Sequence, residues 1–335
     1  MFTRKTTGAI LGIAIIVLSF ISPITASAVT SSTSGNGLRV SPVRTDISLS
    51  AGQSETISVF VQNVTSSPAN LQAIVNDFTA DTNESGAPRI YVNNQYAPTN
   101  SLKRFVQPIP HFTVGPNASK EIPVTITVPK GTAGGGYYGV VRFAPVSAGG
   151  GTVSLSASVG SLILATVQGN IVDNLKIASF DVRSISTDSS GKTHERAGFV
   201  FNSTKNLNLV IRLSNQGNVQ EQPFGKVQLK DRSGKVLAVY EVNDTQPRGN
   251  ILPNSIRRFD IPLTKVGSFG KYTVVGNLGY GTKGQLLTAT TTFYVIPIGL
   301  IFAALVLLLV IILLIVLIPR WLKNHDRKVA RRARR

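Results

Sequence analysis

The residues able to perform chemistry are few in this sequence, and they are widely separated. The chain contains no cysteine and three histidines, His111, His194 and His325, so disulfides, thiol nucleophiles and zinc–thiolate sites are excluded. Hydrolysis by a serine nucleophile requires a histidine that an acid holds beside it, and the sequence indicates no such grouping. We therefore predict that the protein is not an enzyme and that it has no metal site and no cofactor.

Two acid pairs and one glycine-rich stretch remain as candidates for chemistry. Asp81 with Glu84 and Asp188 with Glu195 lie in polar segments, where such side chains commonly bond to the backbone of turns. We interpret them as turn residues, because glycosidase carboxylates cannot be recognised from this spacing. Residues 134–139 are rich in glycine, but neither a helical pattern nor Gly-Lys-Ser/Thr follows them. Close backbone packing at the start of a strand is therefore favoured over phosphate binding.

Residues 81–110 mix aromatic and basic side chains with Asn, Pro and Gly. Long connections within compact domains commonly carry function, and aromatic rings interleaved with bases suit sugar stacking or a partner surface. The alternative is a decorated hairpin whose tyrosines pack locally. The candidate ligand surface comprises Arg89, Tyr91, Tyr96, Lys103 and Arg104.

The elements that position these residues are predicted to be strands. Apolar and polar residues alternate repeatedly between residues 29 and 293, as in the run Ile57, Val59 and Val61, and no segment there shows an apolar stripe of helical period. Turn sequences such as residues 215–218, Asn-Gln-Gly-Asn, separate these runs. The pattern predicts an all-β fold of two tandem immunoglobulin-like β-sandwich domains.

An internal repeat supports the division into two domains. Gly-Pro-Asn followed by Ile-Pro-Val-Thr within residues 114–125 is echoed by Leu-Pro-Asn followed by Ile-Pro-Leu-Thr within residues 251–264. Each copy has an earlier strand that ends at an asparagine, and a later strand that begins with glycines and a tyrosine, whose hydroxyl we expect to bind backbone. These residues are Asn63 and Tyr137 in one copy, and Asn215 and Tyr272 in the other. We place domain 1 at residues 38–169 and domain 2 at residues 173–293.

The N-terminal segment has the order of a secretory signal. Arg4 and Lys5 precede an uncharged apolar run, and the small residues Ala26-Ser27-Ala28 follow it. We predict a signal peptide over residues 1–28. An uncleaved anchor is the alternative, although the apolar run is shorter than the roughly 20 residues that cross a bilayer.

The C-terminal segment is predicted to cross a membrane. Residues 296–318 contain no charge and are mostly Leu, Ile and Val, and a helix that is apolar on every face requires lipid around it. We interpret four flanking residues as anchors at the membrane interface. They are Tyr294, Trp321, Arg320 and Lys323.

The basic tail at residues 319–335 sets the predicted topology. It contains several arginines and lysines and a single acid, Asp326, and the positive-inside rule places such a tail in the cytoplasm. The protein is thus predicted to be a single-pass protein of the cell membrane with both domains outside the cell. About half of the net charge of +18 belongs to the two ends, so the charge reflects topology and no nucleic-acid partner is expected. Binding of the tail to anionic lipid or RNA is the alternative.

This order of parts resembles the WxL-interacting proteins of Gram-positive bacteria. Within domain 1, the resemblance to the peptidoglycan-binding domain of that family rests on Ser41-Pro42, Leu49-Ser50-Ala51-Gly52-Gln53, Phe78-Thr79-Ala80-Asp81, Val128-Pro129 and Gly134-Gly135-Gly136-Tyr137. Domain 2 is more similar to a generic immunoglobulin-like domain of bacterial surface proteins than to the partner-binding domain of the family. The resemblance implies binding to the cell wall or to a surface partner without catalysis.

The sequence thus predicts a membrane-anchored binding protein of the bacterial cell surface. Its partners would be cell-wall polymer or another surface protein, and the lipid bilayer through residues 296–318. Two other functions are alternatives: a wall-associated hydrolase, and a structural stalk or assembly partner that acts by β-strand addition.

Overall fold

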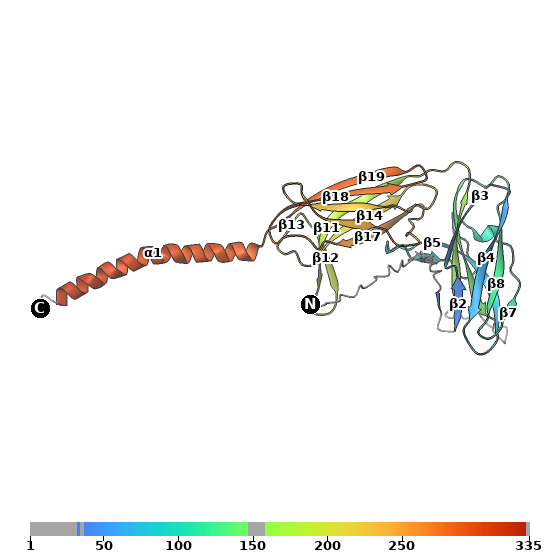
Figure 1. Ribbon diagram of the computed structural model, residues 1–335, viewed down its shortest axis with the longest axis horizontal. Coiled ribbons are helices and arrows are strands. Elements are labelled where there is room, and N and C mark those ends of the chain that lie inside the picture. The colour runs from blue at the N-terminus through green and yellow to red at the C-terminus, as the bar shows by residue number, and fades with distance from the viewer. Residues whose placement is uncertain (1–31, 34–36, 147–157, 333–335) are drawn as a thin grey trace, which may run out of the picture.

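The computed structural model describes residues 32–33, 37–146 and 158–332, with side chains from residue 37 to residue 320. The predicted signal peptide at residues 1–28 lies outside this part of the chain. Two β-sandwiches follow one another, and a long helix leaves the second (Figure 1). The predicted all-β class with a C-terminal apolar helix is therefore confirmed.

Domain 1 is a sandwich of two sheets. One sheet has the strand order β1-β2-β4-β8, and the other has the order β3-β10-β9-β5-β6, with β7 also paired to β5. The chain changes sheet between β2 and β3, and β3 then runs parallel to β10. The bounds are β1 Ser32–Thr33, β2 Leu38–Ser41, β3 Arg44–Leu49, β4 Ser54–Asn63, β5 Ala69–Ala80, β6 Pro88–Ile90, the short helix η1 Lys103–Phe105, β7 Phe112–Val114, β8 Ser119–Thr127, β9 Gly135–Pro145 and β10 Val159–Val167. Because β1 pairs with β2, the sandwich includes residues before position 38, where the sequence placed its start.

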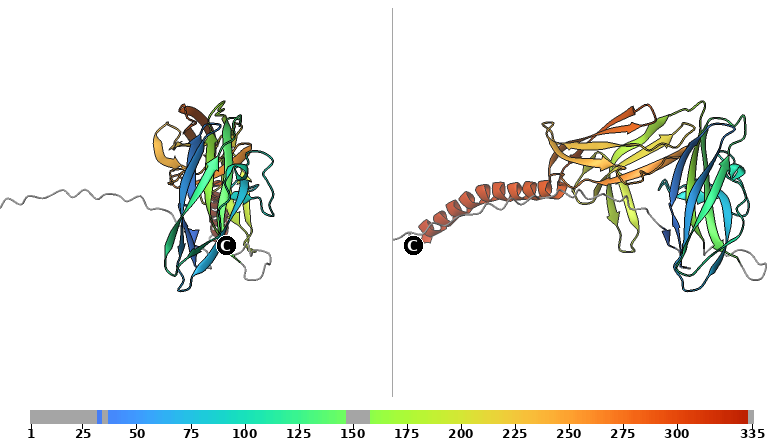
Figure 2. Two further views of the ribbon diagram at one scale, coloured as in Figure 1. Left: turned by 90° about the vertical axis from the view of Figure 1, so that its right-hand side faces the viewer. Right: turned by 45° about the vertical axis from the view of Figure 1, so that its right-hand side comes forward.

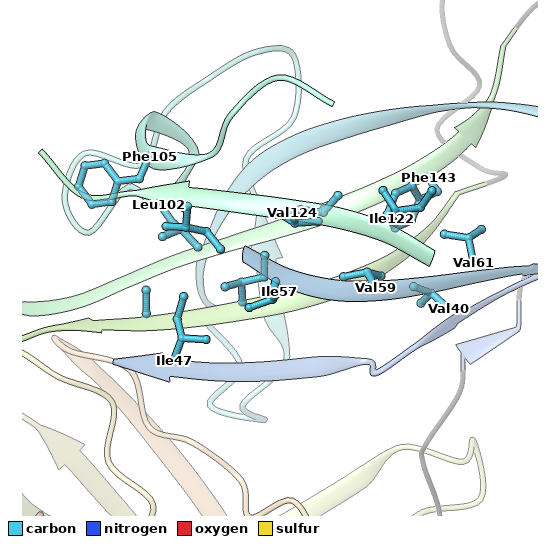
Figure 3. Close-up of a cluster of buried hydrophobic side chains, with 14 of the residues drawn as sticks. Val40, Ile47, Ile57, Val59, Val61, Leu102, Phe105, Ile122, Val124 and Phe143 are labelled. Carbon is cyan, nitrogen blue, oxygen red and sulfur yellow. The ribbon is translucent and has the colours of Figure 1, made fainter. Parts of the chain in front are cut away.

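The core of domain 1 follows from the alternation of its strands. Along β4, Ile57, Val59 and Val61 are buried between the sheets, whereas Ser58 and Phe60 face outward. Figure 3 shows side chains of β2, β4 and β8 from one sheet packed with those of β3 and β9 from the other. A period of two places every second side chain on the same face of a strand, so the apolar set fills a single layer.

Domain 2 repeats this topology apart from the outer strand β12, which follows its neighbour β11 in the chain, and the absence of a counterpart to β7 among its described strands. Its sheets have the orders β12-β11-β14-β17 and β13-β19-β18-β15-β16, and the short strand β13 runs parallel to β19 as β3 runs parallel to β10. The bounds are β11 Leu175–Thr187, β12 Thr193–Ala197, β13 Val200–Phe201, β14 Leu207–Asn215, β15 Phe224–Lys230, β16 Val236–Val242, β17 Ser255–Pro262, β18 Gly270–Tyr280 and β19 Gln285–Val295. The repeat in the sequence thus corresponds to a repeated arrangement of strands.

The repeated asparagines have the same task in both domains. Asn63 and Asn215 are fully buried at the ends of β4 and β14. The amide Nδ2 of Asn63 donates to Ser67 O at 2.7 Å and to Gly115 O at 3.1 Å. The Nδ2 of Asn215 donates to Val219 O at 2.7 Å and to Ile251 O at 2.8 Å. Each buried amide therefore ties together the backbones of two loops, and its own donors are satisfied by their carbonyls.

The expected role of the two tyrosines is also confirmed. Tyr137 Oη donates to Ala133 O at 2.9 Å, and Tyr272 Oη donates to Phe269 O at 3.1 Å. Each hydroxyl closes the loop that leads into its own strand.

The C-terminal helix α1 spans Ile298–Arg332. Within its segment Ile298–Arg320, a window of 18 residues has a mean hydropathy of 3.8 and is not buried against the rest of the protein, so its length and composition allow it to cross a membrane. The helix begins two residues after the predicted start at 296, because Ile296 N still donates to Phe201 O at 2.8 Å in the sheet. It also continues beyond the predicted end of the span at 318 and through much of the basic tail.

Candidate binding surface

The segment that follows β6 is held by two buried polar residues near the end of β5. Asp77 is fully buried, and its carboxylate accepts Ala97 N at 2.9 Å and Lys103 N at 2.8 Å. Asn76 Nδ2 donates to Tyr91 O at 2.7 Å. Leu102 is buried in the core of the domain. These contacts fix the segment at several points along its length, so it is an ordered part of the fold.

The segment presents one aromatic ring beside two cations. Tyr96 is 47% exposed, and Lys103 Nζ and the Arg104 guanidinium carbon lie 4.7 Å and 5.0 Å from the centre of its ring. Lys103 Nζ also donates to Asn94 Oδ1 at 2.6 Å. We name Asn94, Tyr96, Lys103 and Arg104 the Tyr96 patch. Cations at a ring face are attracted to its π electrons, and here they place two positive charges next to an apolar surface.

The five residues of the candidate ligand surface are only partly brought together. Tyr96, Lys103 and Arg104 form the patch, whereas Arg89 lies exposed on β6 and Tyr91 lies half-buried just after it. Among the described contacts, none joins the side chain of Arg89 or Tyr91 to the patch.

The turn between β5 and β6 faces domain 2 and is not part of that surface. Arg212 of β14 forms a two-bond ion pair with Glu84, and one bond, from Nε to Oε2, measures 2.6 Å. The hydrogen bond from Arg212 lowers the pKa of Glu84. Arg258 N on the edge strand β17 also donates to Glu84 O at 2.8 Å. The interpretation of Glu84 as a turn residue is thus incomplete, because its carboxylate joins the two domains.

The glycine-rich start of β9 is the second point of contact between the domains. Gly136 N donates to Asn218 O at 2.7 Å, and Asn218 Nδ2 donates to Gly134 O at 3.1 Å. A Cβ atom on Gly134 would lie 2.8 Å from backbone atoms of residues 169 and 170, a separation that real side chains do not adopt. The prediction of close backbone packing is confirmed, and its partners are residues 169 and 170 after β10 and the loop between β14 and β15 of domain 2.

An apolar cluster and a further polar pair complete this junction. Phe78, Tyr138, Val140 and Leu164 of domain 1 pack with Leu252 of domain 2. Tyr138 Oη donates to Gln220 Oε1 of domain 2 at 3.0 Å. The junction holds the domains at an angle, with their strands running in crossed directions (Figure 1).

Glu221 is a buried acid beside the connection between the domains. It is 2% exposed, and its Oε2 accepts Gly281 N at 3.0 Å. Asp173 of the connection accepts Thr282 N at 3.1 Å and lines the same cavity as Glu221 and Arg248. Burial, assisted by the neighbouring charge of Asp173, raises the pKa of Glu221 to about 7. No pattern of residue types predicts this pair, because the two acids belong to different loops.

The second acid pair of the sequence divides into two roles. Glu195 lies on β12 and pairs with Arg183 at 3.3 Å and with Arg258 at 2.6 Å, so its interpretation as a turn residue is wrong. Asp188 Oδ1 accepts Ser190 N at 2.9 Å and Lys192 N at 3.0 Å, which confirms its interpretation as a turn residue, and Asp188 Oδ2 lies 2.9 Å from His194 Nε2. Within the described part of the chain, no three His, Asp or Glu residues come together in a way that could hold a metal ion.

The predicted membrane anchors lie on both sides of the apolar helix. Tyr294 is on the last strand of domain 2, with its side chain exposed, and Arg320 is exposed at the far end of the candidate span. The side chains of Trp321 and Lys323 lie outside the described residues.

Comparisons with known proteins return structural similarity only. No protein-family model and no curated protein matches the sequence. Among solved structures, the class 5 fimbriae chaperone CfaA is 16% identical, with 78% of this chain and 99% of that chain covered and a TM-score of 0.37. The E. coli chaperone DraB is 16% identical over 77% and 95% of the two chains, with a TM-score of 0.31. A Salmonella enterica complex of the SafA pilin with the SafB chaperone gives 12% identity over 79% and 98%, with a TM-score of 0.33.

These identities and scores transfer neither a ligand nor the role of any residue to this chain. Membership of the WxL-interacting family is not shown by the comparisons and stays a prediction.

Proposed function

We propose that this chain is a single-pass membrane protein of the bacterial surface that binds anionic cell-wall polymer through the Tyr96 patch, without catalysis. Domain 1 lies at the end of the molecule away from α1 (Figures 1 and 2). With α1 in the membrane and the domains outside the cell, domain 2 would act as a spacer. Domain 1 would then be the part that meets the wall.

The observation that carries the proposal is that hydrogen bonds hold the backbone of the Tyr96 patch in one conformation. The fully buried carboxylate of Asp77 accepts Ala97 N at 2.9 Å and Lys103 N at 2.8 Å, so it fixes the backbone directly after Tyr96 and again at Lys103. A binding surface that is already ordered loses less conformational entropy when a ligand binds. The buried carboxylate thus positions the exposed ring of Tyr96 and the cations of Lys103 and Arg104.

The chemistry of the patch favours an anionic polymer with apolar stretches. Lys103 and Arg104 supply positive charge for phosphate or carboxylate groups, and the ring of Tyr96 offers an apolar contact. The resemblance of domain 1 to a peptidoglycan-binding domain supports the same class of ligand. Another surface protein with an acidic face is the second possible partner.

The test is sedimentation of the full chain, in detergent micelles, with isolated cell wall. We expect Tyr96→Ala to weaken retention by about tenfold, the size of effect typical of a central aromatic contact. Retention of the wild type should also fall with salt, since the screening length drops from about 10 Å at 0.1 M to about 3 Å at 1 M. Retention of Tyr96→Ala equal to that of the wild type would show that the patch is not the site.

Domain 2 offers a matched control for this experiment. The guanidinium carbon of Arg248 lies 4.0 Å from the ring centre of Phe224, and Phe224 is 46% exposed, so the pair repeats the chemistry of the patch at another place. Phe224→Ala should leave retention by the wall unchanged. An equal loss in both variants would indicate unspecific binding of aromatic–cation pairs.

Strand addition is the second candidate function, and one edge of domain 2 favours it. The strand β16 ends its sheet, paired to β15 on one side only, and its residues Val236 and Val239 are both exposed. An open edge with apolar side chains is a template for an incoming strand. Hydrogen-exchange protection of β16 by a surface extract, with binding unaffected by Tyr96→Ala, would favour this function.

A further inference from the structure

The connection between domain 2 and α1 is too short to separate the domain from a membrane. Ile296 N is still bonded to Phe201 O in the sheet, and α1 begins at Ile298. Only residue 297 lies between them, and each residue spans at most about 3.6 Å. The end of domain 2 therefore lies within about one headgroup layer of the point where the apolar helix begins.

The length of the apolar helix fixes where the membrane begins. From Ile298 to the proline at 319, the helix rises by about 31 Å at 1.5 Å per residue, which matches the hydrocarbon thickness of about 30 Å. No apolar residue of the helix is left over to lift the domain away. If α1 spans the bilayer, Ile298 therefore lies at the edge of the hydrocarbon.

The end of domain 2 at this position carries exposed aromatic side chains. Phe199 and Phe269 are 70% and 69% exposed, and Tyr294 is exposed as well. Backbone pairing places them together: Tyr294 N donates to Phe199 O at 2.7 Å, and Gly270, which follows Phe269, pairs with Val295. Figure 1 shows β13 and the adjoining ends of β18 and β19 on the side of domain 2 from which α1 leaves. We name Phe199, Phe269 and Tyr294 the aromatic end of domain 2.

We propose that the aromatic end of domain 2 inserts into the headgroup layer of the outer leaflet, so that the domain is docked on the membrane and does not swing on its helix. This inference rests on the proposed membrane anchorage by α1. Aromatic rings prefer the interface between lipid and water, and large apolar side chains exposed at 70% are otherwise unfavourable in water. Continuity with α1 makes lipid the occupant of this surface.

Basic residues beside the aromatic end strengthen the docking. Lys265 lies in the loop before Phe269, and Lys271 pairs in register with Tyr294 on β19. Both lysines are exposed. A cation near a membrane surface gains from anionic headgroups, so the surface combines apolar insertion with electrostatic attraction.

The depth of the aromatic end can be measured with fluorescence. The chain has one tryptophan, so a Trp321→Phe background allows a single probe to be introduced by Phe199→Trp or by Phe269→Trp. The full chain is reconstituted into vesicles of phosphatidylglycerol and phosphatidylcholine, the latter brominated near its headgroup. We expect both variants to be quenched and their emission to shift to shorter wavelength. Bromine is present in both leaflets, so the direction of insertion does not affect the result.

The matched control lies at the end of β19 opposite to Tyr294. Leu286 is 66% exposed near the start of β19, and the Leu286→Trp variant should remain unquenched, with emission typical of water. Quenching at positions 199 and 269 no stronger than at 286 would overturn the docking proposal.

The failure of the docking proposal can be told apart from the failure of anchorage. Trp321 of the unmodified chain should be quenched by the same lipids if α1 spans the bilayer. If Trp321 is quenched while Phe199→Trp and Phe269→Trp are not, the anchorage stands and the docking is wrong. If no probe is quenched, both are wrong.

Discussion

Replacing Asp77 by alanine is expected to lower the free energy of unfolding by about 4 kcal/mol, because two amide groups then lose their acceptor and each buried unpaired group costs about 1–3 kcal/mol. The amides are those of Ala97 and Lys103. The segment that carries the Tyr96 patch should lose its order, so retention by cell wall should be lost with it. Chemical denaturation measures the first effect, and amide exchange of residues 91–106 measures the second.

The Asp77→Asn variant separates charge from positioning. Its amide oxygen still accepts one hydrogen bond, so we expect it to keep part of the stability and part of the wall binding. If Asp77→Ala folded normally, exchanged slowly in residues 91–106 and bound wall like the wild type, the buried carboxylate would not position the patch.

A second large effect is expected in the pH dependence of the free energy of unfolding, caused by the titration of Glu221. Its pKa is about 7 in the folded protein against an ordinary 4.5, so between these values the folded state holds a proton that the unfolded state has released. Stability should therefore fall as the pH rises from about 4.5 to about 7, by at most about 3 kcal/mol, and stay level above that range. Denaturant unfolding at a series of pH values measures this slope.

The Glu221→Gln variant should remove the slope, because glutamine has no proton to lose. Its amide oxygen still accepts the bond from Gly281 N, and its NH₂ group can donate to Asp173. We expect the variant to be more stable than the wild type at pH 8 and close to it at pH 4. An unchanged slope in this variant would place the titrating group elsewhere.

The sequence predicted the fold class well because the alternation of its strands is strong. Residue types alone predict that Ile57, Val59 and Val61 of β4 are buried. These side chains form one apolar face of the strand, and such a face packs against another apolar face in the core. The repeated asparagines were recognisable for a similar reason. A side chain that bridges two loops leaves its trace at matching positions in both domains, as Asn63 and Asn215 do.

The candidate site was harder to predict because its positions are set by contacts distant in the sequence. The composition of residues 81–110 drew attention to Tyr96, Lys103 and Arg104, and the fold gathers these three. The composition of this stretch does not reveal that its Glu84 pairs with Arg212 of the other domain. The carboxylate that orders the patch, Asp77, lies inside a strand, where a sequence offers no sign that a buried acid has found two backbone donors.

The topology of the chain is tested most directly by labelling single cysteines in intact cells, since the natural chain has none. Lys130→Cys in domain 1, Lys283→Cys in domain 2 and Ala330→Cys in the basic tail are each exposed to a membrane-impermeant maleimide. We predict that the first two are labelled in intact cells and that the third is labelled only after the membrane is permeabilised. Labelling of Ala330→Cys in intact cells, with Lys130→Cys and Lys283→Cys protected, would contradict the account.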